Sequence, residues 1–165
     1  MIALETRHGF RFAMRLATHE DEPALADFFA QVTDEDRRFR FLSAVRQVSP
    51  GHLHAMTDFA YHRHETFLAF TPGGQAIIAA ATLAVDEAGA TGEVAISILP
   101  DHKGKGIGWT LLDHVAQEAR QWGVTKLQSI ESRDNRAAIS LEQEMGFTAR
   151  PIEDEPGVVL LERAF

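Results

Sequence analysis

The stretch ILPDHKGKGIGWTLLDHV, residues 98–115, places three glycines and two lysines directly before a run with helical apolar spacing. The glycines are Gly104, Gly106 and Gly108, and the lysines are Lys103 and Lys105. Glycines at alternate positions let successive backbone N–H groups point into one concavity, and the positive end of a helix expected from Trp109 onward strengthens the potential there. The stretch therefore favours a strand-to-helix turn that holds an anion, over glycines that only make a sharp turn.

Two familiar phosphate-binding loops do not fit this stretch. A Walker loop reads GxxxxGK(S/T), and no Gly-Lys pair in the chain is followed by Ser or Thr. A dinucleotide-binding loop reads GxGxxG after the first strand of a βαβ unit, whereas GxGxG here follows several strands. The stretch therefore favours a pyrophosphate ligand that neither of these two loops binds. An NAD-binding or nucleotide-binding protein stays an alternative, which only binding of NAD or ATP would support.

The residues around this stretch alternate between strand and helix patterns. Strand patterns cover residues 10–17, 66–70, 75–85, 89–99 and 125–132, and two more flank the turn at 153–157. Helix patterns follow Pro23, span residues 52–59 and 109–122, and run from Asn135 as N-cap to Gly146. The order predicts a single domain, residues 1–165, of the α/β or α+β class.

The composition of the chain excludes several classes of function. The chain has 165 residues, 45% of them hydrophobic, which fits one domain with a sizeable core. It lacks cysteine, which excludes disulfides, thiolate nucleophiles and cysteine-based zinc sites. A net charge of -8 argues against broad binding of nucleic acid or anionic membranes. The sequence has no apolar run of signal or membrane-spanning length, so we expect a cytoplasmic protein.

A longer segment, residues 93–147, resembles the acyl-CoA core of the GNAT superfamily of N-acetyltransferases. That core carries the pattern (Q/R)xxGx(G/A) and, after a helix and a strand, the pattern NxxAixxxxxxGF. Lys103, Gly106 and Gly108 match the first pattern, with Lys in place of Gln or Arg. The second pattern is matched by Asn135, Ala138, Ile139, Gly146 and Phe147. MRLATHED, residues 14–21, is similar to the first-strand entry of the superfamily, so the resemblance covers nearly the whole chain.

The middle of the chain resembles one subgroup of this superfamily. Residues 38–70 are similar to the acceptor-side helices of the GNAT domain in bacterial Pat-type protein lysine acetyltransferases, which commonly follow a synthetase-like region that this sequence lacks. The resemblance implies a mixed, mostly antiparallel central sheet of six to seven strands with helices on both faces. It also implies acetyl-CoA as cosubstrate without a metal, and a small-molecule amine or a protein lysine as acceptor, with a homodimer as one possible assembly.

The resemblance further implies how the cosubstrate is held. The strand before the glycine stretch is expected to splay from the next strand, so that its backbone can pair with pantetheine amides. N–H groups of residues 104–108 would take the pyrophosphate, and Asn135 would touch the cosubstrate while also serving as an N-cap. The predicted binding residues are Ile98, Leu99, Lys103, Gly104, Lys105, Gly106, Ile107, Gly108 and Asn135.

Transfer to an amine needs a base, because an alkylammonium group with a pKa near about 10.4 must lose a proton before it attacks. Glu93 lies ten residues before Lys103, where many GNAT enzymes place a catalytic Glu. Strand alternation puts Glu93 on the side opposite Val94. We predict Glu93 as the catalytic residue, and an ordinary exposed strand Glu is the competing interpretation.

The departing thiolate needs a proton, and many GNAT enzymes supply it from a Tyr at the position of Glu142. The single tyrosine of this chain is Tyr61. Glu142 could serve only if burial raised its pKa well above about 4.3, and a solvent-facing Glu is the favoured interpretation. Ser140 and a water are weaker alternatives, and Pat-type domains also tend to lack this Tyr. The missing Tyr motivates a second hypothesis, a non-catalytic acyl-CoA-binding sensor or regulatory module.

Four histidines form two HxH pairs, at His52, His54, His62 and His64. A metal site needs three or four converging ligands, so this spacing predicts no metal. We expect these histidines to line the acceptor cleft or to lie on the surface. His64 or its neighbour Glu65 could act as a second base, although an ordinary role is favoured for both.

Overall fold

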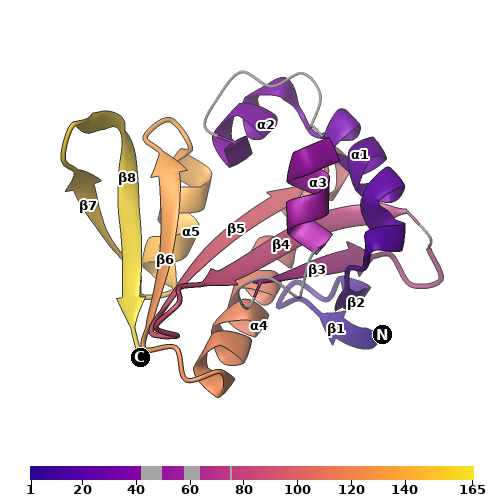
Figure 1. The fold of residues 1–165 in the computed structure, drawn as a ribbon. Coiled ribbons are helices and arrows are strands. Elements are labelled where there is room, and N and C mark those ends of the chain that lie inside the picture. The colour runs from indigo at the N-terminus through magenta and orange to yellow at the C-terminus, as the bar shows by residue number, and fades with distance from the viewer. Residues whose placement is uncertain (42–49, 58–63, 75) are drawn as a thin grey trace.

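The computed structural model describes residues 1–41, 50–57, 64–74 and 76–165. Its strands form one sheet in the order β1-β2-β3-β4-β5-β6-β8-β7 (Figure 1). Neighbouring strands are antiparallel except β5 and β6, which are parallel. The strands are β1 (Ile2–Glu5), β2 (Arg11–Leu16), β3 (His64–Phe70), β4 (Ile77–Val85), β5 (Thr91–Ile98), β6 (Lys126–Ser132), β7 (Thr148–Ile152) and β8 (Glu155–Ala164).

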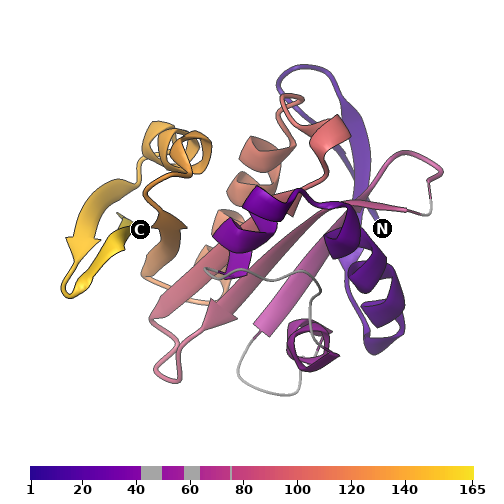
Figure 2. The ribbon, with the colours of Figure 1, turned by 90° about the horizontal axis from the view of Figure 1, so that it is seen from above.

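Helices cover both faces of this sheet (Figure 1 and Figure 2). α1 to α3 lie on one face, and α4 and α5 pack against the core on the other. The helices are α1 (Glu22–Gln31), α2 (Asp34–Phe41), α3 (Pro50–Thr57), α4 (Ile107–Gln121) and α5 (Arg136–Glu144), with short 3-10 helices η1 (His19–Asp21) and η2 (Pro100–His102). None of the helices in the described ranges is long and apolar enough to cross a bilayer.

β3 shows how the sheet separates two hydrophobic cores. Phe67 packs in the core beneath α4, and its neighbour Leu68 packs in the core beneath α1 and α3. This alternation is the period of two that a strand buried on both faces must have. Full burial of one such side chain contributes roughly 1.5–3 kcal/mol, so the central strands form the rigid part of the domain.

The predicted fold class is confirmed, with two differences in detail. The sheet has one strand more than the six to seven expected, because β1 joins it at the edge. Three of the four residues of β1 are exposed, so the alternation that reveals a half-buried strand is absent there. The helix expected over residues 52–59 begins instead at Pro50, and its predicted end beyond Thr57 lies outside the described residues.

The single parallel pair in the sheet is short. β5 and β6 are in register only from Thr91 opposite Lys126 to Glu93 opposite Gln128, and beyond these residues the strands diverge (Figure 1). On its other side, β5 pairs with β4 along its whole length as far as Ile98. The splaying expected between these strands is therefore confirmed, and from Val94 onward none of the described strands pairs with this edge of β5.

Candidate functional site

A cavity of about 360 Å³ fills the gap between the diverging strands. On one face of the sheet its wall is built by the glycine stretch, α4 and α5, and on the other face by α2. Arg40 of α2 donates to the hydroxyl of Thr82 at 3.4 Å, and Thr82 lies on the α1 to α3 side because it alternates with Leu83 of the opposite core. The cavity therefore lies in the split of the sheet and is lined by residues from both of its faces.

The open edge of β5 offers unpaired backbone groups to this cavity. The amide of Leu99 donates to the carbonyl of Ile78 at 2.9 Å, so the backbone of Leu99 is turned toward β4. In an antiparallel ladder this orientation alternates along the strand. The N–H and C=O groups of Val94, Ile96 and Ile98 therefore face the gap, and all three residues line the cavity.

The glycine stretch forms the mouth of the cavity. Gly104 and Gly106 have φ angles of 76° and 87°, in the left-handed region that favours glycine. Gly106 is the N-cap of α4, which begins at Ile107 rather than at Trp109 as expected. The first N–H groups of α4 have no partner within the helix, so this end of α4 carries positive potential at the mouth.

Neighbouring elements hold the glycine stretch in place. A Cβ on Gly106 would come within 2.9 Å of the His8 ring and 3.1 Å of Thr6, which belong to the turn between β1 and β2. The ammonium group of Lys105 lies 4.7 Å from the ring centroid of Phe10, beside the same turn. Lys103 forms an ion pair with Asp36 of α2. Lys103 therefore bridges the mouth of the cavity to the opposite face.

The predicted site residues fall into two groups. Those that line the cavity are Ile98, Lys103, Gly104, Gly106, Gly108 and Asn135. The described residues that line the cavity do not include the other four, which are Glu93, Leu99, Lys105 and Ile107. Ile107 is a core residue with 1% exposure. The predicted N-cap role of Asn135 is confirmed, because its side chain accepts from the Ala138 amide at 3.4 Å.

The expectation that Glu142 faces solvent is wrong. Its side chain is 5% exposed and lines the cavity. Ala138 and Met145 stand four residues before it and three after it, so Glu142 lies on the inward face of α5. One of its oxygens, Oε1, is buried without a hydrogen-bond partner. The helical spacing of Glu142 from Ala138 and Met145 was the sequence signal that could have predicted its burial.

Glu142 belongs to a buried polar cluster with β6. Burial, the nearby negative charge of Glu131 and a hydrogen bond with Glu131 raise the pKa of Glu142 to about 9, and a hydrogen bond with Ser129 opposes them. Glu131 in turn accepts from the Ser129 hydroxyl at 2.7 Å and from the Asn135 amide at 3.3 Å. The structure thus joins Asn135 to Glu142 through Glu131, a residue to which the sequence did not point.

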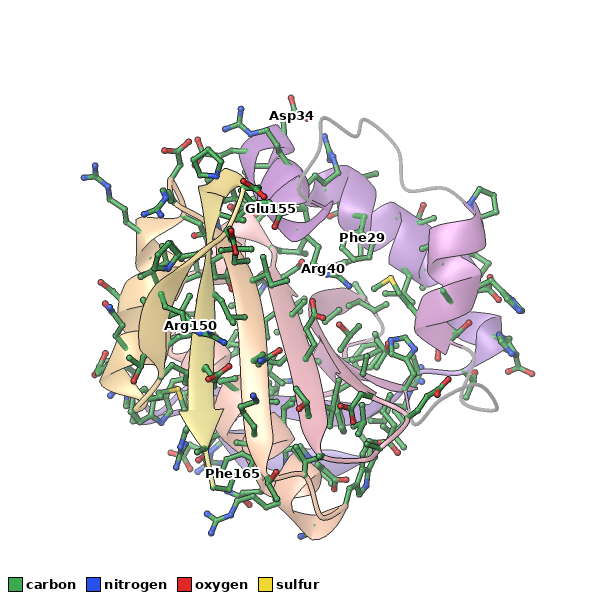
Figure 3. All side chains as sticks on the ribbon, turned by 60° about the vertical axis from the view of Figure 1, so that its left-hand side comes forward. Phe29, Asp34, Arg40, Arg150, Glu155 and Phe165 are labelled. Carbon is green, nitrogen blue, oxygen red and sulfur yellow. The ribbon has the colours of Figure 1, made fainter. Side chains whose placement is uncertain are left out.

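On the opposite face, Glu93 and Arg40 form the charged approach to the cavity. Glu93 is exposed, and it points to the side of α2 because the adjacent Val94 is buried in the core under α4. Burial lowers the pKa of Arg40, and the charges of Glu93 and Glu131 oppose that shift. Figure 3 shows Arg40 in the space between α2 and the strands.

The histidines do not converge on this cavity in the described part of the chain. His54 stacks on His19 with ring centroids 4.7 Å apart, and both lie beside Glu22. His64 starts β3, and Glu65 lies on the α4 side, where burial and the charge of Glu118 raise its pKa. His62, Tyr61 and the side chain of His52 lie outside the described residues.

Comparison with known proteins matches this arrangement to one family. A model described as the acetyltransferase (GNAT) family matches residues 26–147. Acetyltransferase PA5475 of Pseudomonas aeruginosa is 26% identical over 154 residues, which cover 92% of this chain and 83% of that protein. The GNAT domain of S. lividans PAT superposes with a TM-score of 0.89 at 26% identity, covering 99% of this chain and 96% of that one.

A more distant structure shares the fold. Spermidine N-acetyltransferase from Vibrio cholerae, solved with CoA and spermine, has a TM-score of 0.73 at 17% identity, over 93% of this chain and 95% of that one. The family model spans most of the chain and includes both the glycine stretch and α5. The chain is therefore an acetyltransferase of the GNAT family.

Proposed function

We propose that this protein moves the acetyl group of acetyl-CoA to a primary amine by direct attack, with both substrates bound together. The observation that carries the proposal is the cavity in the split of the sheet, which is lined by residues from both faces. Acetyl-CoA would enter on the face of α4 and α5, and the amine on the face of α2. Direct transfer needs the two substrates to meet without blocking each other, and entry from opposite faces would provide this.

The residues of the cavity fit an acyl-CoA. From Val94 to Ile98 the open edge of β5 spans roughly 13 Å at the usual rise of a strand. Along this edge, the backbone groups of Val94, Ile96 and Ile98 would pair with the pantetheine amides. Leu99, which stays a predicted contact, has its amide bonded to β4 and would contribute through its side chain.

The mouth of the cavity fits the pyrophosphate of CoA. Lys103 supplies a positive charge, and the N-terminus of α4 supplies N–H groups and the positive end of the helix dipole. The side chain of Lys105 packs on Phe10 and that of Ile107 is in the core, so both residues would act through their backbone N–H groups. Asn135, at the start of α5, would contact the cosubstrate deeper in the cavity.

Glu93 would act as the base that removes a proton from the amine. Its carboxylate lies on the acceptor face, at the point where β5 and β6 part. Because Glu93 is not part of the described wall of the cavity, the proton would pass through a water molecule. The net charge of -8 favours cationic acceptors, and a polyamine such as that named for the Vibrio cholerae relative or a protein lysine would fit this class.

The reaction itself is tested by calorimetry and a free-thiol assay. We expect the protein to bind CoA and to release thiol from acetyl-CoA only when a suitable primary amine is present. The assay would use a panel of alkylamines, polyamines and lysine peptides. CoA binding without thiol release over the whole panel would contradict the proposal and favour a non-catalytic acyl-CoA sensor.

A Gly106→Val variant tests the mouth of the cavity. The left-handed backbone and the contacts with His8 and Thr6 leave no room for a side chain, so the loop must shift. We expect the Kd for CoA, measured by calorimetry, to rise by about 10-fold to 100-fold. Gly157→Val is the matched control, because a Cβ on Gly157 meets nothing within 4 Å. Equal affinity in both variants would remove the glycine stretch from the site.

A Glu93→Gln variant tests the base. We expect kcat at neutral pH to fall by roughly 10²-fold, because the amide cannot take the proton, while the Kd for acetyl-CoA stays nearly unchanged. Glu87→Gln, on the exposed turn between β4 and β5, is the control for the loss of one surface charge. Wild-type turnover in the Glu93 variant would show that another group removes the proton.

A further inference from the structure

The buried pair of Glu131 and Glu142 is the most unusual chemical feature of the described chain. Two carboxyl groups lie together in the cavity wall, one from β6 and one from α5. Glu131 uses both of its oxygens, accepting from Ser129 and from Asn135. Glu142 keeps one oxygen, Oε1, that is buried and has no hydrogen-bond partner among the residues that the structure describes. An unsatisfied buried oxygen in a cavity wall indicates a role toward a ligand.

The two carboxyl groups have different protonation. Neighbouring carboxylates cannot both ionise easily, so the proton stays on the one that is less well supported by donors. Glu131 accepts from two donors, whereas burial and the negative charge of Glu131 hold the pKa of Glu142 near 9. Glu142 therefore carries a proton at neutral pH, and its carboxyl group lies in the cavity wall.

The other charged groups near Glu131 and Glu142 do not change the conclusion that Glu142 carries the proton. From α2, Arg40 interacts electrostatically with Glu131, and it is not among the causes of the raised pKa of Glu142. Burial and Glu131 are the two largest causes of the shift of Glu142. The cavity wall also contains the charged residues Arg7, Asp36 and Lys103. Arg163, on the neighbouring β8, lies against Gly146.

The place of the pair in the cavity decides what its proton could reach. Gln128 is the last residue of β6 in register with β5, Ser129 follows it directly, and Glu131 stands three residues beyond it. Glu142, which interacts with Ser129, thus lies toward the closed end of the split, while the glycine stretch forms the mouth. If the pyrophosphate binds at the mouth, the thioester of an extended acyl-CoA must lie toward this closed end. Glu142 is also on the α4 and α5 side, opposite Glu93.

We propose that Glu142 is the general acid of the transfer and donates its carboxyl proton to the sulfur of the departing CoA. This inference rests on the proposed function. The lone pair of the neutral amine forms the C–N bond to the acetyl carbon, and the C–S bond breaks with its electron pair going to sulfur. The Glu142 proton moves to that sulfur, which gives the CoA thiol and a Glu142 carboxylate.

The remaining proton transfers take place on the two faces of the sheet. The new amide nitrogen loses its extra proton on the α2 side, to Glu93 or to water, and a proton from solvent restores Glu142. The net reaction converts amine and acetyl-CoA into N-acetylamine and CoA thiol. Glu131 is a positioning residue in this scheme, because its charge keeps the proton on Glu142, and Ser129 and Asn135 hold Glu131 in place.

A Glu142→Gln variant tests the assignment through kinetics and its pH dependence. We expect kcat to fall by roughly 10-fold to 10²-fold, with little change in KM for either substrate, because the amide keeps the shape but cannot donate an acidic proton. Only the protonated carboxyl donates, so wild-type kcat should decline as pH rises through about 9 and the variant should lose that decline. Glu142→Tyr should restore turnover, since a phenol can donate instead. Gln143→Ala, exposed on the same helix, is the control.

Two readouts do not depend on turnover. In ¹³C NMR of protein labelled at Glu carboxyl carbons, a resonance that titrates near pH 9 should be present in the wild type and absent from Glu142→Gln. The folded-state pKa is raised above its ordinary value, so this group stabilises the fold at low pH and that contribution is lost as pH rises through about 9. The Tm of Glu142→Gln relative to wild type should therefore increase as pH rises from 4.5 to about 9, and should change no further above that pH.

The outcomes separate this inference from the proposed function. A wild-type protein that binds acetyl-CoA and releases no thiol would contradict the proposed function. A wild-type protein that turns over, together with a Glu142→Gln variant of equal kcat or a Glu142 carboxyl that titrates near pH 4 to 5, would contradict only the general-acid assignment. A rise in KM for the amine with unchanged kcat would also overturn it, because the pair would then bind the ammonium group.

Discussion

The early end of pairing between β5 and β6 is the constraint on which the rest of the site depends. Three register positions join the two strands, and then each follows its own neighbours, β5 along β4 and β6 along β8. A continuous sheet would satisfy the backbone of β5 and would close the cavity. The split leaves polar backbone groups of β5 unpaired, and such groups are costly to bury unless a ligand pairs with them. The open strand edge is thus a binding surface that the fold itself provides.

The split also gives the site two chemically different faces. On the α2 face, the carboxylate of Glu93 is exposed and close to Arg40, which suits a group that takes up a proton. On the α4 and α5 face, Glu142 is buried beside Glu131 and has its pKa raised to about 9, which suits a group that gives one up. In the proposed mechanism, burial and neighbouring charge direct the same side-chain type to opposite tasks.

Much of the fold could be predicted from the sequence, because its signals are local. The alternation in β2, the helical spacing in α4 and the Asn135 cap each depend on residues close together in the chain. The Glu142 environment was missed for two reasons. A charged residue on a helix is usually exposed, and its partner Glu131 is brought to it only by the packing of α5 against the sheet. Long-range contacts of this kind, like that between Lys103 and Asp36, leave no periodic pattern.

A crystal structure with CoA and a primary amine bound together would test the central claim most directly. The account predicts that pantetheine lies along the open edge of β5, that the sulfur is within hydrogen-bonding distance of the Glu142 carboxyl, and that the amine enters from the side of α2. CoA bound away from the split, or a sulfur and an amine that both approach from one face of the sheet, would contradict it.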